Sequence, residues 1–127
     1  MTTAQAIIFD SSTLISLAMN GLLPELKNLK EIFNGKFMIT KEVKYEVIDK
    51  PLTIKKFELE ALKLKQLLDD KILETPKSLG IDEALITKKS NEIMNIANTT
   101  FQARERDIHL MDMGESSCLV LGRILDE

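Results

Sequence analysis

Short apolar runs alternate along this chain with longer stretches in which apolar residues recur every three or four positions. The first run, residues 6–9, is brief and partly β-branched, which suits a strand covered on both faces, as in a parallel sheet. Residues 36–40 and 71–75 are candidates for a second and a third strand. We therefore predict a parallel sheet with the first strand at its centre.

The residues between the first two strands predict two amphipathic helices. Ser11 or Ser12 is available as the N-cap of the first helix, and Gly21 and Pro24 mark the break before the second. Each helix would pack one apolar stripe on the core. The stripes are predicted to contain Leu14, Ile15, Leu17 and Ala18 in the first helix and Leu26, Leu29, Ile32 and Phe33 in the second.

Four further helices are predicted after the second strand. Thr40 can cap a helix over residues 41–49, and a long helix covers residues 52–73. Asp82 can cap a fifth helix, and the last helix begins near Asp112 or Met113. The stripe of the long helix is expected to pack inward or against a second subunit in a homodimer. The inner faces are predicted to contain Val43 and Val47, then Phe57, Ala61, Leu64 and Leu68, and finally Leu119, Val120 and Ile124.

The composition is that of a single globular domain. The chain has 127 residues, of which 44% are hydrophobic and 29% charged, and it contains no repeat and no linker. Its N-terminus lacks the basic segment of a secretory signal, and its apolar runs are far shorter than the roughly 20 residues that cross a bilayer. We therefore expect one cytoplasmic domain over residues 1–127.

Charge and residue usage narrow the chemistry. The formal net charge of −3 argues against a protein that binds nucleic acid mainly through a basic surface. It is compatible with an acidic metal site, whose negative charge is offset only when cations bind. His109 and Cys118 are the only histidine and cysteine, so a histidine-based zinc site and an internal disulfide are excluded within this chain. Cys118 lies among apolar residues and is interpreted as a small core residue.

Three acidic residues occupy similar places in separate predicted elements. Asp10 ends the first strand, Glu46 lies in the helix after the second strand, and Glu115 lies in the first turn of the last helix. Open α/β sheets bind ligands at the carboxyl ends of their strands. Divalent ions that cleave phosphodiesters prefer carboxylate oxygens as ligands. We therefore predict that the three carboxylates face one cavity at this edge of the sheet.

Each acid also has a simpler structural interpretation. Asp10, at a junction between strand and helix, can cap the helix. Glu46 can be an exposed helix residue, and Glu115 can complete a capping box with Asp112. Position along the chain does not by itself choose between these roles and metal binding.

Three stretches resemble a known family. "IIFDSSTLISLAMNGLLPELKNLKEIF" looks like the opening of a PIN domain, in which an Asp ends the first strand and a Ser/Thr-rich turn and two helices follow. "FMITKEVKYEVID" is similar to the family's strand followed by T/P-x-x-V-x-x-E, which aligns Thr40, Val43 and Glu46. "LMDMGESSCLVLGRIL" resembles the L-D-x-G-E helix of a branch related to VapC-type toxins, and it aligns Glu115 with the family's internal acid.

The resemblance implies a Rossmann-like α/β/α sandwich and a ribonuclease that depends on Mg²⁺ or Mn²⁺. Asp10, Glu46 and Glu115 would ligate the metal, and Ser11 or Ser12 would support the site through water or the Asp10 carboxylate. RNA would be the substrate, and an antitoxin-like or other protein partner is implied as well. The family's further acid, on a strand after the last helix, has no counterpart before Glu127. We therefore expect a domain that is incomplete at its C-terminus, and weak or no cleavage by these 127 residues alone.

Two alternatives remain at this point. The chain can be a non-catalytic PIN-like module that binds RNA or a protein partner through the helices of residues 51–109. It can also be a helical regulatory protein with a small sheet, in which case the spacing of the three acids is fortuitous.

Overall fold

Three parallel strands form the centre of the protein in a computed structural model that describes residues 5–102 and 113–126. Ile8 pairs with Met38 on the next strand, and Met38 pairs with Glu74 on the third. The strands are β1 (Gln5–Ile8), β2 (Gly35–Met38) and β3 (Leu73–Glu74), in the order β1-β2-β3. The parallel sheet is therefore confirmed, and each strand is shorter than or offset from the predicted run.

The central strand of this described sheet is β2, so the prediction that the first strand lies at the centre is wrong for these residues. The reason is the direction of the crossovers. The connection from β1 to β2 and the connection from β2 to β3 both step to the neighbouring position in the same direction across the sheet. The strand order therefore repeats the order along the chain, and β1 forms an edge.

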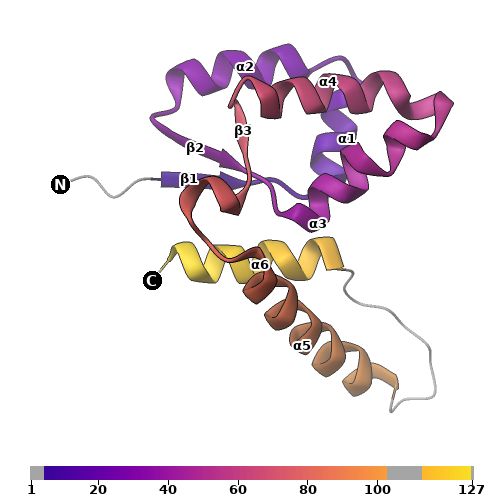
Figure 1. The fold of residues 1–127 in the computed structure, drawn as a ribbon, viewed down its shortest axis with the longest axis vertical. Coiled ribbons are helices and arrows are strands. Elements are labelled where there is room, and N and C mark those ends of the chain that lie inside the picture. The colour runs from indigo at the N-terminus through magenta and orange to yellow at the C-terminus, as the bar shows by residue number, and fades with distance from the viewer. Residues whose placement is uncertain (1–4, 103–112, 127) are drawn as a thin grey trace.

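Helices cover both faces of the sheet, so the fold is a helix-rich α/β arrangement (Figure 1). The first crossover contains α1 (Ser11–Met19) and α2 (Leu23–Ile32). The second contains α3 (Lys41–Lys44), the π-helix η1 (Tyr45–Asp49), the short 3₁₀ turns η2 (Pro51–Thr53) and η3 (Lys55–Phe57), and α4 (Glu58–Asp69). The chain continues from β3 through the 3₁₀ turn η4 (Pro76–Leu79) to α5 (Glu83–Gln102) and α6 (Met113–Leu125).

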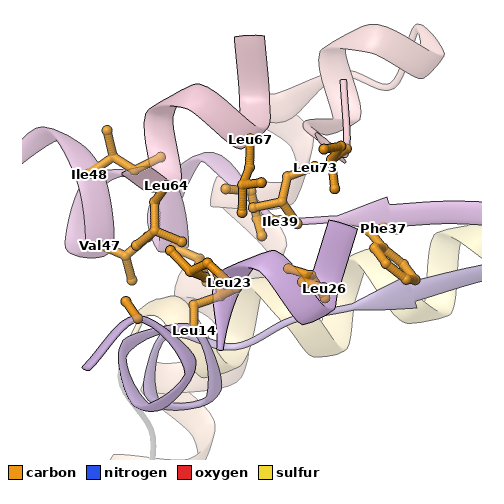
Figure 2. Packing of buried hydrophobic residues seen from close by; sticks show 13 residues of the cluster. Leu14, Leu23, Leu26, Phe37, Ile39, Val47, Ile48, Leu64, Leu67 and Leu73 are labelled. Carbon is orange, nitrogen blue, oxygen red and sulfur yellow. The ribbon is translucent and has the colours of Figure 1, made fainter. Parts of the chain in front are cut away.

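Alternating side chains of β2 and the residue after it separate two apolar cores. Phe37 and Ile39 point into the larger core, which α1, α2 and α4 cover (Figure 2). Met38 points to the opposite face and packs with Ile86 of α5 and Leu121 of α6. This separation follows from the two-residue period of a strand. Both cores hold the strand ends, and with them the carboxyl edge of the sheet, in a fixed position.

Several predicted helix faces are confirmed. Val43 and Val47 are buried on α3 and η1, and Ala61 and Leu64 are buried on α4. The predicted cap at the start of α3 is also present, because Thr40 Oγ1 accepts a hydrogen bond from Val43 N at 3.2 Å. The patterns were informative here because each helix packs a single face on the core.

Other predicted core positions are exposed. Ile32 is 82% exposed because it lies about 180° around α2 from the buried Leu23, and Leu29 is 55% exposed on the flank of the same helix. Phe57 is 40% exposed because the chain makes the separate turn η3 before α4 begins, and Leu67 is buried on α4 instead. Leu119 is 53% exposed because it is rotated by about 100° from the buried Val120.

The first helix begins one residue earlier than predicted. Its N-cap is Asp10, whose backbone is extended, whereas Ser11 is already the first helical residue. The prediction that Ser11 or Ser12 is the cap is therefore wrong. The Asp82 cap is confirmed, because its Oδ1 accepts from Ala84 N at 2.9 Å.

Two predictions fall outside the described residues, namely those for His109 and for Asp112 as the start of the last helix. None of the helices in the described ranges is both long enough and apolar enough to cross a membrane.

Candidate functional site

Asp10 lies at the carboxyl end of β1, where it caps α1 and stays partly exposed to solvent. Its Oδ1 accepts a hydrogen bond from Thr13 N at 2.9 Å, and its Oδ2 is 3.3 Å from Ser12 Oγ. These hydrogen bonds make Asp10 the N-cap of α1 (Ser11–Met19). The capping interpretation of Asp10 is therefore correct, but it does not exclude metal binding.

The ionised form of Asp10 is stabilised by its neighbours. Hydrogen bonds from the Thr13 side chain, from the Thr13 backbone N–H and from the Ser12 side chain hold the pKa of Asp10 below its ordinary value. Partial burial acts in the opposite direction without reversing the shift. Asp10 is therefore a carboxylate, the form that ligates a cation, throughout the neutral pH range.

Glu46 lies in the π-helix η1. Lys50 N donates to Tyr45 O, five residues back, at 2.9 Å, and Pro51 directly after it has no N–H with which to continue the helix. Single π-turns within helices often occur at functional sites, because the extra residue changes the direction of the side chains around it. The buried Val47 and Ile48 fix this turn against the core, and Glu46 is half-buried beside them.

Glu115 lies in the first turn of α6, as predicted. Two contacts of the next turn fix α6 beside the strand ends. Ser117 Oγ lies 2.6 Å from Thr40 Oγ1, just after β2, and Cys118 Sγ lies 3.7 Å from the carbonyl oxygen of Phe9, just before Asp10. Cys118 also packs against the larger core, as its interpretation as a core residue requires.

The three acids converge. Asp10, Glu46 and Glu115 line one cavity of about 250 Å³, together with Ser11, Ser12 and Ile15. We call it the acid cavity. The cavity lies at the carboxyl edge of the sheet, because Asp10 follows β1 and Glu46 follows β2 and α3. Residues separated by more than 100 positions are therefore neighbours, although their roles as metal ligands stay a prediction.

Ser11 and Ser12 contribute differently to this cavity. Ser12 donates to Asp10, so it helps to orient the carboxylate. Ser11 Oγ is buried and has no hydrogen-bond partner among the residues that the structure describes. Buried hydroxyl groups without a partner are uncommon in folded proteins, because desolvation is then uncompensated. Ser11 lines this cavity, and its Oγ is buried as placed, so its role as a ligand or donor stays a prediction.

The donor atoms suit a hard divalent cation, but they are not arranged as a closed metal cage. Across residues 5–102 and 113–126, no group of three or more His, Cys, Asp or Glu side chains could hold a metal ion as placed. Mg²⁺ does not require such a cage, since it usually keeps several waters and binds one or two carboxylates directly. Asp10, Glu46, Glu115 and Ser11 carry oxygen atoms, the ligand type that Mg²⁺ and Mn²⁺ prefer, and metal binding at this cavity stays a prediction.

Sequence reasoning missed a second group of side chains beside this cavity. Thr87 of α5 donates a hydrogen bond of 2.5 Å to Glu42 of α3, and Glu42 also lines a neighbouring cavity with Tyr45. Glu42 and Thr87 are 45 residues apart, and neither stands at a position that a motif or a period distinguishes. Only the packing of α5 against α3 could identify this pair.

No family model matches this chain, and no curated protein or solved structure matches it either. The resemblance to PIN domains therefore rests on the sequence stretches that carry it, and it stays a prediction.

Proposed function

We propose that this protein is a PIN-type ribonuclease that cleaves RNA phosphodiester bonds with Mg²⁺ or Mn²⁺ at the acid cavity. One observation carries the proposal: Asp10, Glu46 and Glu115, which come from three separate elements, line the same cavity at the carboxyl edge of the sheet. Like charges brought together by a fold repel one another, and a bound divalent cation removes that cost. In this proposal, a divalent cation bound at the cavity offsets the negative charge of the three carboxylates.

Each residue has a distinct part in this proposal. Asp10, held ionised by its hydrogen bonds, is the primary ligand, and Glu46 and Glu115 bind directly or through water. Ser11 Oγ supplies a further oxygen or donates to a metal-bound water, which would give it the partner that it lacks. Ser12 keeps the Asp10 carboxylate in orientation.

The chemistry needed at this cavity is the in-line attack of water on a phosphodiester. A divalent cation, when bound, lowers the pKa of water and offsets the charge that develops on the phosphate. The protein's part is to bring the RNA phosphate to the carboxylates and to orient the attacking water. Glu46 of η1 and Glu115 of α6 are the groups that can accept the proton of that water.

A second candidate function is a PIN-like module that binds RNA or a protein without cleaving. It is favoured by the absence, among the described side chains, of a group that could hold a metal ion as placed. In this case the acid cavity would be a remnant, and Asp10 would act only as the cap of α1.

Cleavage of a fluorescently labelled single-stranded RNA tests the choice. The protein from its complete natural reading frame is incubated with Mg²⁺ or Mn²⁺, and with EDTA as the metal-free reference. We expect cleavage only with the cation, and a loss of at least about 100-fold in Asp10→Asn, which keeps the shape but weakens a ligand.

Glu25→Gln is the matched control, because Glu25 is an exposed acid of α2 that does not line the acid cavity. It should cleave as the unchanged protein does. Equal metal-dependent cleavage by the unchanged protein and Asp10→Asn would reject the proposed active site. Binding of RNA without cleavage under any of these conditions would favour the non-catalytic module.

A further inference from the structure

A second, larger cavity adjoins the acid cavity. Its volume is about 700 Å³, which is within the range of sites that hold small molecules. Glu46 lines both cavities, so they share a wall. The side chains that matter here come from α3, η1 and α5: Lys41, Glu42, Lys44, Tyr45 and Thr87. A molecule that reaches the acid cavity can therefore extend into this one.

Glu42 is the unusual group in this larger cavity. Its Oε1 accepts the hydrogen bond from Thr87 Oγ1, but its Oε2 is buried and has no hydrogen-bond partner within the described part of the chain. A buried carboxylate oxygen without a donor is unfavourable. The last torsion of a glutamate is broad, so a small rotation can turn Oε2 towards a donor that enters the cavity. Glu42 thus offers one unused acceptor.

Tyr45 and the two lysines also line this cavity, together with Asp49 and Met113. Tyr45 is 57% exposed and follows Glu42 by three residues, which places both on one side of the helical segment. Exposed aromatic rings are the usual platforms on which bases of single-stranded nucleic acid stack. Lys41 and Lys44 add positive charge for a phosphate backbone. Lys44 is paired with Asp49 at 3.3 Å, but the pair is partly exposed, and such pairs exchange partners at little cost.

We propose that this cavity binds the base of the nucleotide next to the scissile phosphate, with Tyr45 stacked on the base and Glu42 accepting a hydrogen bond from its amino group. The choice of RNA as ligand rests on the proposed function. The cavity then acts as the specificity site of the nuclease, and Glu42 and Thr87 set the preferred base.

The chemistry of Glu42 ranks the bases. A carboxylate only accepts hydrogen bonds, and it pairs with donors such as the amino group of cytosine. Guanine offers N1–H and its amino group side by side, and Glu42 can accept both, one on Oε2 and one on the second lone pair of Oε1, so guanine should bind best. Adenine and cytosine each offer one amino group. Uracil has its N3–H between two carbonyl oxygens that repel a carboxylate, so it should bind worst.

Titration of the 127-residue chain with GMP, AMP, CMP and UMP in EDTA tests this inference. Chemical shifts of the backbone amides report each dissociation constant, and EDTA removes any metal-dependent binding or cleavage. We expect GMP to bind at least about tenfold more tightly than UMP. The shifts should centre on Lys41, Glu42, residues 44–46 and Thr87, which line the cavity.

Three variants separate recognition from folding. Glu42→Gln places an amide donor where Oε2 stands, so UMP should bind at least as tightly as GMP. Tyr45→Ala should weaken all four nucleotides alike, and Tyr45→Phe should bind as the unchanged chain does. Glu92→Gln, an exposed site on the same helix as Thr87, should change nothing and serves as the control.

Equal dissociation constants for all four nucleotides would overturn the inference. So would a Glu42→Gln chain that folds and keeps the preference for GMP. Shifts at the cavity caused by a lysine-rich peptide, with none caused by nucleotides, would also overturn it and would indicate a basic protein partner. The titration needs no metal, so its result is independent of cleavage. A base preference without cleavage would count against the proposed function alone. Cleavage without a base preference would count against this inference alone.

Discussion

Thr40 Oγ1 and Ser117 Oγ lie 2.6 Å apart in the interior, although 77 residues separate them in the chain. Ser117 Oγ donates to Gly114 O, and Thr40 Oγ1 accepts from Val43 N, so the proton between the two hydroxyls belongs to Thr40. This chain of hydrogen bonds joins the start of α3 to the first turns of α6. It holds the two helical segments that carry Glu46 and Glu115 in a fixed relation.

Thr40→Val should therefore be costly. The change leaves Ser117 Oγ without its donor and removes the cap of α3, while the volume of the side chain stays nearly the same. We expect the free energy of unfolding to fall by about 1–3 kcal/mol in a urea titration. Thr53→Val, at an exposed threonine, should change it by less than about 0.5 kcal/mol, and an equally small change for Thr40→Val would argue against the link.

Gly35 permits the close approach of β2 to its neighbours. A Cβ atom at this position would clash with the carbonyl oxygen of Gln5 and would lie 2.6 Å from Cε1 of Phe33. Gly35→Ala should lower the free energy of unfolding by about 1–3 kcal/mol. Gly122→Ala is the contrasting variant, because its Cβ would meet Ile8 Cδ1 at an ordinary 3.6 Å within helix α6. It should stabilise the protein by up to about 1 kcal/mol, and the same sign for both variants would contradict this packing.

The stripe of α4 packs on the protein's own core. Leu64 is 2% exposed and belongs to the larger core cluster, whereas Leu62 on the same helix is 46% exposed. Leu64→Ala should cost about 2–5 kcal/mol of stability, and Leu62→Ala should cost much less. Thermal unfolding of both variants checks this, and similar melting temperatures would contradict the assignment of the buried face. Inward packing accounts for this stripe, so the stripe gives no support to a homodimer, which stays a prediction that the mass in solution can test.

Asp10 should make stability depend on pH. Because the folded state lowers the pKa of Asp10, its ionised form stabilises the fold above the pKa of the unfolded chain. This contribution is lost as the pH falls through the lower, folded pKa. Asp10→Asn keeps a good capping residue but cannot ionise. We expect the difference in the free energy of unfolding between the unchanged protein and Asp10→Asn to shrink as the pH falls through the acidic range. A difference that does not depend on pH would contradict the lowered pKa of Asp10.

The sequence predicted the features that depend on the spacing of apolar residues along a helix and on a residue's position relative to a strand. Val43, Val47 and Ala61 were placed inside by their spacing, and Asp10 was placed at the sheet edge by the apolar run before it. The prediction of Ile32 as a core residue is wrong, because the predicted stripe of Leu26, Leu29, Ile32 and Phe33 is wider than the face that α2 buries, which contains only Leu23 and Leu26.

The features that the sequence did not predict depend on contacts between distant elements. The bond from Thr87 to Glu42 and the bond between Thr40 and Ser117 both arise where helices meet across a strand end. Neither pair has a local pattern, because a single Ser or Thr in a helix is compatible with many environments. The strand order was also beyond local reasoning, since it depends on which way each crossover turns.

Binding of Mn²⁺ tests the central claim, that Asp10, Glu46 and Glu115 form one divalent-metal site, most directly. The free ion is followed by electron paramagnetic resonance during titration of the 127-residue chain, of Asp10→Asn, Glu46→Gln and Glu115→Gln, and of the control Glu25→Gln. We expect each cavity variant to weaken Mn²⁺ binding by at least about tenfold and the control to leave it unchanged. Equal Mn²⁺ affinity in all five proteins would contradict the account.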